Sequence, residues 1–599
     1  MDQKRLFLAI AISIAILLGF QYLMPHPPVP PHPPGTAEQT QGGQGQGGQG
    51  QGGVASSGQP QAGVAPAVSG APAQAAVAAN AVPKSVPRVT IDAPRVAGSI
   101  SLLGARIDDL SLKDYRETLA ANSPLVRLLE PRSDPQPYYV QYGWTAAVGQ
   151  AEKLPDDATV WSASAPSLGV GRPVTLSWDN GAGLTFEIVL SIDENYMFSV
   201  EQVVKNATGA PVQVFPWARI RRDYTPQVAG YYVLFEGLLG VVDGTLQETT
   251  YAKTKSEGDK QPGGVAYDAT ATGGWAGMTD KYWLTAVVPD QKVAATVKFR
   301  HIAQDGDHYQ VDYVTKAPLT VAPGGTATLP SRVFAGAKVV RLLDAYENEY
   351  KIPSFDKAVD FGWFYFLTKP IFYCLDWLNG LPFVPNFGVA IMIFTVFAKA
   401  LFFPLANYSY RSMSKMKLLG PKMTAMRERY KDEPQRMQQE MMALYKQEGV
   451  NPASGCLPMV VQIPVFFSLY KVIFVTIEMR QAPFFGWIHD LSAVDPTNLF
   501  NLFGLIPFDP TVISPMLHMG AWPLIMGLTM FLQQKLNPPP PDPMQARLFQ
   551  LMPIVFTFMM ARFPAGLIIY WSWNNLLSIA QQWVIMRRTH LSRPGLART

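Results

Sequence analysis

Long apolar runs, separated by polar segments, dominate the last third of the chain. Each run approaches the ~20 residues that an α-helix needs to cross the hydrocarbon core of a bilayer. The five runs cover residues 387–408, 457–477, 522–536, 548–563 and 565–586. A sixth run lies within residues 1–24, after Lys4 and Arg5, and no A-x-A cleavage site follows it. This pattern favours an uncleaved signal anchor over a cleaved signal peptide, so the sequence predicts six transmembrane helices.

A different pattern, with a period of two, runs through residues 88–350. Apolar and polar residues alternate over 174–178 and again over 184–192, with Asn180-Gly181 as a turn signal between them. This order predicts a β-hairpin. Similar short runs recur along the whole segment, so we expect a large antiparallel β-sandwich domain over residues 88–350.

Two segments flank the predicted sandwich. Residues 25–87 are rich in Pro, Gly, Gln and Ala, a composition that cannot bury a core, and we expect a disordered linker there. Residues 351–385 mix aromatic residues with Lys and Asp. That mixture predicts an amphipathic helix on the membrane surface, broken near Pro370. The same segment also fits a simpler interpretation as the last element of the sandwich domain.

Residues 409–456, between the first two C-terminal runs, show a helical periodicity. Apolar residues recur every three or four positions on both sides of Pro434, which predicts an antiparallel helical hairpin with an adaptable methionine-rich seam and a basic exterior. The residues that carry this interpretation are Met416, Lys417, Lys422, Met423, Met426, Arg427, Arg429, Met437 and Met441. The pattern fits either a solvated charged hairpin or a docking surface for a partner or a nascent chain.

Composition and charge narrow the class of protein. Charged residues make up 16% of the 599 residues and hydrophobic residues 48%, whereas soluble domains carry roughly 25% charged residues. A net charge of only +4 argues against a soluble nucleic-acid binder, and two cysteines exclude a disulfide-stapled scaffold. Residues 409–456 hold nine Lys and Arg, whereas 480–521 hold only Arg480. The positive-inside rule therefore places the hairpin and both termini in the cytoplasm and residues 25–385 outside.

No catalytic signature is present, so we expect no enzyme activity, no cofactor and no metal site. There is no G-x-x-x-x-G-K-[ST], no G-x-S-x-G and no H-E-x-x-H. The informative residue is Lys399, inside the run 387–408, because a charge there costs ~2.5–3.5 kcal/mol unless it faces protein or water. Polar groups of different helices could simply hydrogen-bond to one another. Because no acidic residue lies in the central part of any run, a water-filled cavity around Lys399 is the favoured interpretation.

Three long motifs resemble a known family. They are PKMTAMRERYKDEPQRMQQEMMALYKQEGVNPASGCLPMVVQIPVFFSLY at 421–470, RQAPFFGWIHDLSAVDP at 480–496 and FPAGLIIYWSWNNL at 563–576. Over about 355–588 the chain is similar to the YidC/Oxa/Alb membrane insertase family. The resemblance implies a polytopic α-helical protein of six transmembrane helices. Its five-helix core, here 386–588, would enclose a hydrophilic groove. A short tail, 589–599, follows the core, and the outer domain would be a periplasmic β-supersandwich.

The resemblance also implies the function and the site. Such a protein inserts and folds proteins of the bacterial inner membrane, alone or with the Sec translocon, and Lys399 takes the place of the usual groove arginine. Together with the polar residues of the other runs, it predicts a groove formed by Lys399, Thr395, Gln462, Tyr570, Trp571, Ser572 and Asn575. Implied partners are nascent membrane proteins, the Sec translocon, the ribosome, signal recognition components and lipid, with no nucleic acid other than ribosomal RNA. The alternatives are a chaperone that acts only with Sec, a transporter, and an enzyme or sugar receptor built on the β domain.

Overall fold

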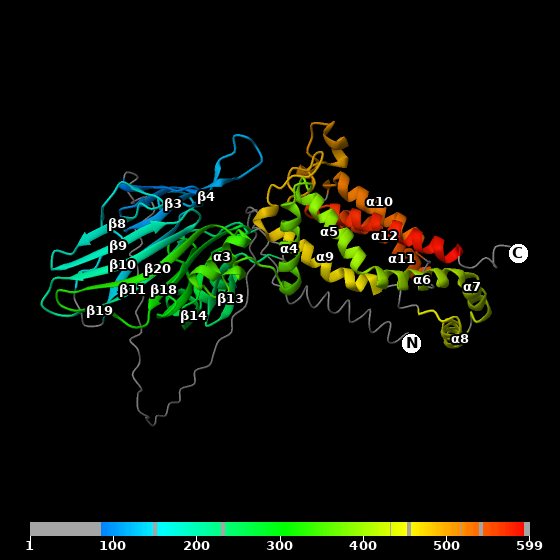
Figure 1. Cartoon of the computed structure of the whole chain (residues 1–599), viewed down its shortest axis with the longest axis horizontal. Coiled ribbons are helices and arrows are strands. Elements are labelled where there is room, and N and C mark those ends of the chain that lie inside the picture. The colour runs from blue at the N-terminus through cyan, green and yellow to red at the C-terminus, as the bar shows by residue number, and fades with distance from the viewer. Residues whose placement is uncertain are drawn as a thin grey trace, which may run out of the picture. The chain divides into compact units, whose positions relative to one another are not determined.

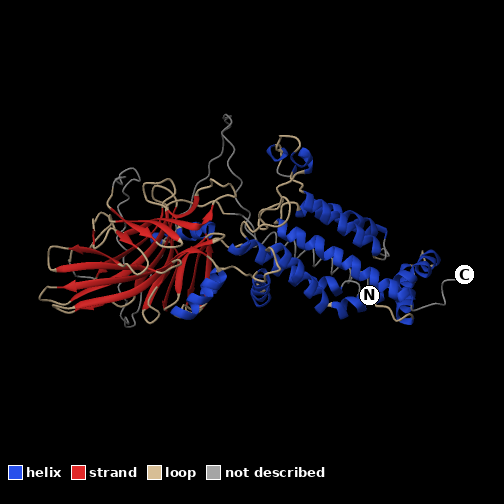
Figure 2. Cartoon of the chain, turned by 45° about the horizontal axis from the view of Figure 1, so that its top comes forward, coloured by secondary structure: helices blue, strands red, loops and turns tan. Residues whose placement is uncertain are grey.

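The computed structural model describes residues 86–147, 152–228, 234–431, 433–451, 457–514, 517–537 and 543–591. The predicted anchor at 1–24, residues 25–85 of the predicted linker and residues 592–599 of the predicted tail lie outside this part of the chain. The described residues form a β-rich region followed by a helical region (Figures 1 and 2).

Two antiparallel sheets make up most of the β-rich region. The strands of the first sheet, in spatial order, are β14 (Val265–Thr272), β17 (Ala294–Ile302), β18 (His308–Thr315), β11 (Val212–Arg222), β5 (Tyr138–Ala146), β3 (Arg106–Arg116), β2 (Val96–Ser101), β1 (Arg88–Asp92) and β7 (Ser167–Leu168). Within this sheet β19 (Leu319–Val321) pairs with β11, β4 (Leu125–Leu129) pairs with β3, and the short pairing of β1 with β7 is parallel. The strands of the second sheet are β13 (Thr245–Thr250), β12 (Gly237–Val242), β15 (Trp275–Thr279), β16 (Trp283–Val288), β20 (Thr326–Ala337), β10 (Met197–Asn206), β9 (Leu184–Ile192), β8 (Val174–Asp179) and β6 (Ser162–Ala163).

The two sheets share one apolar core. Trp144 of β5 meets Phe186 of β9 with ring centroids 5.1 Å apart, and Gln202 of β10 donates a hydrogen bond to the Gly143 carbonyl at 2.8 Å. The predicted sandwich is therefore confirmed. A short helix, α2 (Tyr251–Gly258), begins after Thr250, whose hydroxyl accepts a hydrogen bond from the Lys253 amide and caps the first turn.

The hairpin predicted from alternation is confirmed in its register. Strands β8 and β9 pair antiparallel, with Val174 opposite Leu190 and Asp179 opposite Thr185. Along β9, buried and half-buried positions alternate without exception, as a strand with one face on the core requires. Gly181 in the connecting turn has a φ of +73°, which glycine adopts without a steric penalty.

Three short helical elements follow the sandwich: α3 (Val340–Tyr350), η3 (Phe355–Ala358) and α4 (Tyr365–Asn379). The aromatic side chains of Trp363, Phe366 and Trp377 are exposed. The expected break near Pro370 is wrong, because α4 continues through this residue. Pro370 lies in the second turn of the helix, where its missing N–H removes a single backbone hydrogen bond.

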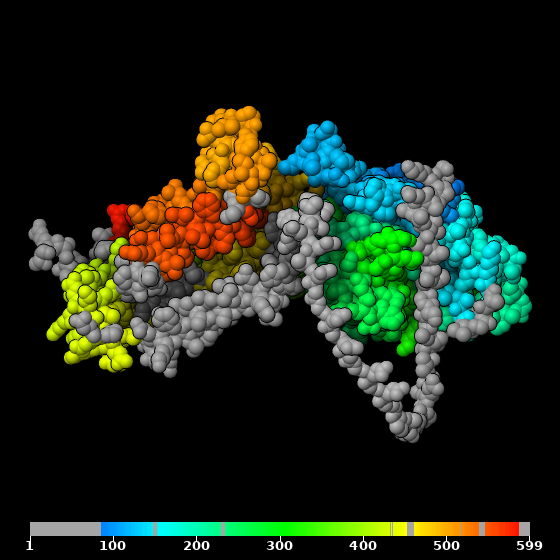
Figure 3. Space-filling model, turned by 180° about the vertical axis from the view of Figure 1, so that it is seen from behind, coloured from blue at the N-terminus to red at the C-terminus, as the bar shows by residue number. Residues whose placement is uncertain are grey.

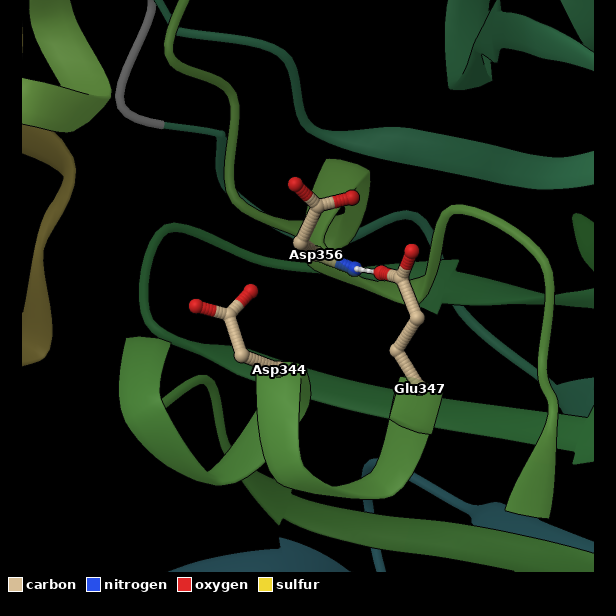
Figure 4. Close-up of side chains that lie close together, drawn as sticks. All are labelled: Asp344, Glu347 and Asp356. Atoms are coloured by element: carbon tan, nitrogen blue, oxygen red, sulfur yellow. Dashed lines mark hydrogen bonds between the residues drawn. The ribbon is translucent and has the colours of Figure 1, made fainter. Parts of the chain in front are cut away.

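Ion pairs between a group of acidic side chains and Lys369 link α3 and η3 to α4. Asp344, Glu347 and Asp356 converge, and the Asp356 amide donates a hydrogen bond to Glu347 at 3.2 Å (Figure 4). Lys369 of α4 places its ammonium 2.9 Å from Asp344 and 2.5 Å from Asp356. The positive charge that converging carboxylates require is thus supplied by a side chain of the protein itself.

The helical region continues with the longer helices. They are α5 (Phe387–Leu401), α6 (Phe403–Leu418), α7 (Gly420–Arg429), α8 (Pro434–Gln447), α9 (Leu457–Val475), α10 (Ala521–Leu536), α11 (Pro543–Met560) and α12 (Ala565–Leu591). Between α9 and α10 the described residues include the short 3₁₀ turns η5 (Ile477–Met479), η6 (Leu499–Gly504) and η7 (Pro510–Val512). Helix α12 packs against α5, α6, α9 and α10, and α4 packs against α5 and α9.

The expectation of one continuous helix over 387–408 is wrong. Helix α5 ends at Leu401 and α6 begins at Phe403, with a bend of 67° between them. Pro404 explains the break, because it lacks an N–H and its ring would clash with the carbonyl of Ala400 in a continuous helix. Among the described helices, none alone has the length and apolar character to cross a bilayer, whereas α5 and α6 meet that test as a bent pair.

Candidate functional site

Lys399 lies in the last turn of α5 and points toward α12. Its ammonium donates a hydrogen bond to the Ser578 hydroxyl at 2.7 Å, and that hydroxyl donates to the Asn574 carbonyl at 2.7 Å. The lysine is half-buried, and none of the described carboxylates forms an ion pair with it. The charge is therefore held by a neutral group and keeps its capacity to attract an anion.

A polar stripe on α12 forms the surface to which Lys399 binds. Tyr570, Asn574, Ser578 and Gln582 follow one another at intervals of four residues, which places them on one face of the helix. All four side chains are buried. The residues predicted for the groove do not include Asn574 and Ser578, although their four-residue spacing from Tyr570 was a usable signal.

Gln462 and Tyr570, two of the predicted groove residues, lie on different helices and contact each other. The Gln462 amide of α9 donates a hydrogen bond to the Tyr570 hydroxyl of α12. The adjacent Trp571 packs edge-on against Phe466 of α9, with ring centroids 4.7 Å apart, and against Phe556 of α11, with ring centroids 5.9 Å apart. An aromatic wall thus joins α9, α11 and α12 beside the polar stripe.

The other three predicted groove residues make different contacts. The hydroxyl of Thr395 donates to the Ile391 carbonyl at 2.6 Å, and that of Ser572 donates to the Ile568 carbonyl at 2.8 Å, both within their own helices. Asn575 donates to the Thr529 hydroxyl at 3.2 Å and so links α12 to α10. Thr395 lies one turn before Lys399, whereas the described bonds of Ser572 and Asn575 lead away from it.

The predicted hairpin residues lie on the last turns of α6 and on α7 and α8, and α7 and α8 protrude at one end of the helical region (Figures 1 and 3). A small core of Leu419, Met423, Tyr445 and Val450 is buried, and the Tyr445 hydroxyl lies 3.6 Å from the Met423 sulfur. Partly buried side chains pack against this core or lie beside it: Met416, Met426, Met437, Met441 and Arg427. The exposed side chains are those of Lys417, Lys422 and Arg429, and Lys422 forms an ion pair with Glu448 at 2.9 Å.

Comparison with known proteins identifies the family. Residues 88–374 match the family model described as YidC periplasmic domain, and residues 378–592 match the one described as 60Kd inner membrane protein. The chain is 61% identical to the membrane protein insertase YidC of Granulibacter bethesdensis over 100% of both chains. It is 55% identical to the protein of that name from Acidiphilium cryptum, over 84% of this chain and 85% of that one. Among solved structures, an active YidC insertase with its first transmembrane domain resolved gives a TM-score of 0.33 at 18% identity, over 83% of this chain and 93% of that one.

These matches define an inner-membrane protein with a periplasmic β-sandwich domain and a C-terminal helical region. Proteins of this class insert other proteins into the membrane. The chain belongs to the YidC family of membrane protein insertases. The resemblance found in the sequence is thereby confirmed, as are the insertase function and the expectation that the protein is not an enzyme. The number of transmembrane helices, the side on which the termini lie and the roles of single groove residues stay predictions.

Proposed function

We propose that Lys399 is the electrostatic centre of a wet groove, formed by α5, α9 and α12, through which the polar flank of a substrate enters the membrane. The observation that carries this proposal is the single ammonium held by the Ser578 hydroxyl at 2.7 Å on an otherwise uncharged polar stripe. Two further oxygens, Asn574 Oδ1 and Ser468 Oγ, are buried without a partner among the described residues. An unbonded buried polar atom costs about 1–3 kcal/mol, which favours an interior that admits water.

The groove lowers the barrier that a polar flank meets. A substrate helix is apolar and gains free energy on entering lipid, whereas its flank must cross about 30 Å of hydrocarbon. A water-filled groove shortens the dry path, and the Lys399 ammonium attracts acidic residues in the flank. The apolar helix then leaves past the aromatic wall around Trp571. No nucleotide is needed, because transfer of apolar surface drives the step.

The arrangement of the protein in the membrane belongs to the same proposal. Six transmembrane helices with cytoplasmic termini place the hairpin of α7 and α8 in the cytoplasm and the sandwich in the periplasm. The exposed cations and the partly buried methionines of the hairpin suit first contact with a nascent chain. The ribosome and the Sec translocon are the proposed partners on this route.

The proposal is tested with the purified full-length chain in liposomes. A short single-span substrate with an acidic flank is added without nucleotide, and insertion is read by protease protection. Protection above that of empty liposomes is expected. Absence of protection, with the protein folded by its circular dichroism, would instead support a chaperone that acts only beside the Sec translocon.

A further inference from the structure

A pocket of about 320 Å³ lies where the sandwich meets the helical region. Three cations line it, and they come from three separate segments: Lys281 from the turn before β16, Arg480 from the end of η5, and Arg562 from the turn between α11 and α12. Two carboxylates, Glu117 and Asp490, also line it, so the five ionised groups together carry one net positive charge. The proposed groove does not use any of these residues.

The cations of this pocket are only partly satisfied by the protein. The Lys281 ammonium lies 3.9 Å from the Phe474 ring centroid, and no described carboxylate forms an ion pair with it. Burial lowers the pKa of Lys281 to about 8, so a neighbouring anion would relieve the cost of holding this charge. Arg480 donates to the Arg116 carbonyl at 2.6 Å and to the Glu117 carbonyl at 3.2 Å, both of which are neutral acceptors. Arg562 is exposed, and its guanidinium forms no ion pair with a carboxylate in the described part of the chain.

The walls of the pocket are apolar where they approach the helices. Phe474, Val494 and Pro564 line it together with the three cations. Phe474 is in the last turn of α9, and Pro564 immediately precedes α12. With the membrane arrangement proposed above, both residues lie where the outer edge of the hydrocarbon begins. The loop after α9 supports this position at the outer edge of the membrane. It exposes Leu505 and other large apolar side chains, and it stands out in Figure 3.

We propose that this pocket binds the headgroup of a phospholipid from the outer leaflet of the inner membrane, with its phosphodiester on Lys281, Arg480 and Arg562. A phosphodiester carries one negative charge, which matches the net charge of the pocket. Guanidinium groups form strong, short hydrogen bonds to phosphate oxygens. The apolar wall suits the glycerol and the first methylenes of a lipid, whereas a free phosphate ion has nothing to place there. Such a lipid would bind to both the sandwich and the helical region.

The binding test uses the full-length chain in detergent and counts retained phosphatidylglycerol by native mass spectrometry. Arg562→Gln is the first variant, because its exposed side chain leaves the fold intact, and Lys281→Gln is the second. Loss of one charge-assisted hydrogen bond to an anion predicts about tenfold weaker retention of the first lipid. Lys316→Gln, an exposed lysine elsewhere on the sandwich, is the matched control and should retain lipid as the wild type does.

Two results would overturn the proposal. One is equal lipid retention by the wild type, Arg562→Gln and Lys281→Gln. The other is displacement of the lipid by inorganic phosphate at an equal concentration, which would make the pocket a site for free phosphate. The readout is binding and does not require insertion activity, so a failure here is distinguishable from a failure of the proposed groove.

Discussion

Replacement of Lys399 by methionine removes the charge of the proposed groove while it keeps a long, flexible side chain of similar volume. The ammonium bonds only to the neutral Ser578 hydroxyl among the described partners, so the change does not leave an opposite charge unpaired. The fold should therefore tolerate the substitution, and its main effect should fall on substrates that carry acidic flanks. Lys399→Arg, which keeps the charge, is the conservative partner of this variant.

The expected loss of insertion rate follows from the distance between the Lys399 ammonium and a substrate carboxylate, and from the dielectric around them. A substrate carboxylate that takes a place beside the ammonium would bring two unit charges to about 4 Å. Their attraction is about 1 kcal/mol in bulk water and about 4 kcal/mol at the effective dielectric of a protein surface. Lys399 is half-buried, so the value lies between these limits. Since each 1.4 kcal/mol is about tenfold in rate, insertion of an acidic-flank substrate should slow by at least about fivefold.

The assay compares two substrates that differ only in the flank, one acidic and one neutral, in proteoliposomes at low salt with protease protection as the readout. Lys399→Met should lower the ratio of acidic to neutral insertion, and Lys399→Arg should restore it. Lys316→Met, which removes an exposed lysine of the sandwich, is the matched control for net charge. An unchanged ratio in Lys399→Met would refute the electrostatic part of the mechanism.

Three further predictions concern contacts outside the proposed groove. Burial raises the pKa of Glu478 from 4.5 to about 7, so its stabilising contribution is complete below pH 4.5 and is lost as the pH rises through about 7. The Tm of the wild type should therefore fall over this window relative to Glu478→Gln, and parallel Tm curves would contradict the assignment. Met423→Ala should destabilise the hairpin core by about 2–5 kcal/mol and speed proteolysis of the hairpin. Met442→Ala, at an exposed position, should have neither effect. Equal cleavage rates of the two variants would be evidence against burial of Met423 in this core. Tyr282→Phe removes the 3.1 Å hydrogen bond to Ser492 and should cost about 1 kcal/mol, seen as faster hydrogen exchange of the loop at 490–494; unchanged exchange would count against this contact.

The parts of the fold that depend on local periodicity could be predicted from the sequence. The alternation over 184–192 defined strand β9 and its register, since a shift by one residue would turn every apolar side chain to solvent. Each C-terminal apolar run also corresponds to helical structure, because burial of an apolar segment requires its backbone to bond internally. What periodicity could not supply was the effect of single prolines. Pro404 breaks an apolar run that is long enough to form one helix, whereas Pro370 lies inside an unbroken helix.

The candidate site was predictable only in part, for a similar reason. Lys399 was identifiable because a charge in an apolar run is costly wherever the run folds. The spacing from Tyr570 suggests which residues of α12 share its face, but which of them meets Lys399 depends on tertiary packing. Ser578 is one of several polar residues in that helix, and only the structure places it 2.7 Å from the ammonium. Ser572 and Asn575 are equally polar, yet their described bonds lead to α12 itself and to α10.

The break between α5 and α6 helps to explain how the protein holds the charge of Lys399. Because α5 ends at Leu401, Lys399 lies in its last turn rather than at the middle of a long helix. The free carbonyl groups at a helix C-terminus favour a cation by about 0.3–1 kcal/mol, and the Ser578 hydroxyl adds a hydrogen bond. Together these offset part of the ~2.5–3.5 kcal/mol that a lysine costs at a helix centre. The lysine is thus held without an ion pair to any carboxylate of the described residues, and in the proposed mechanism the attraction that such a pair would consume is left for the substrate.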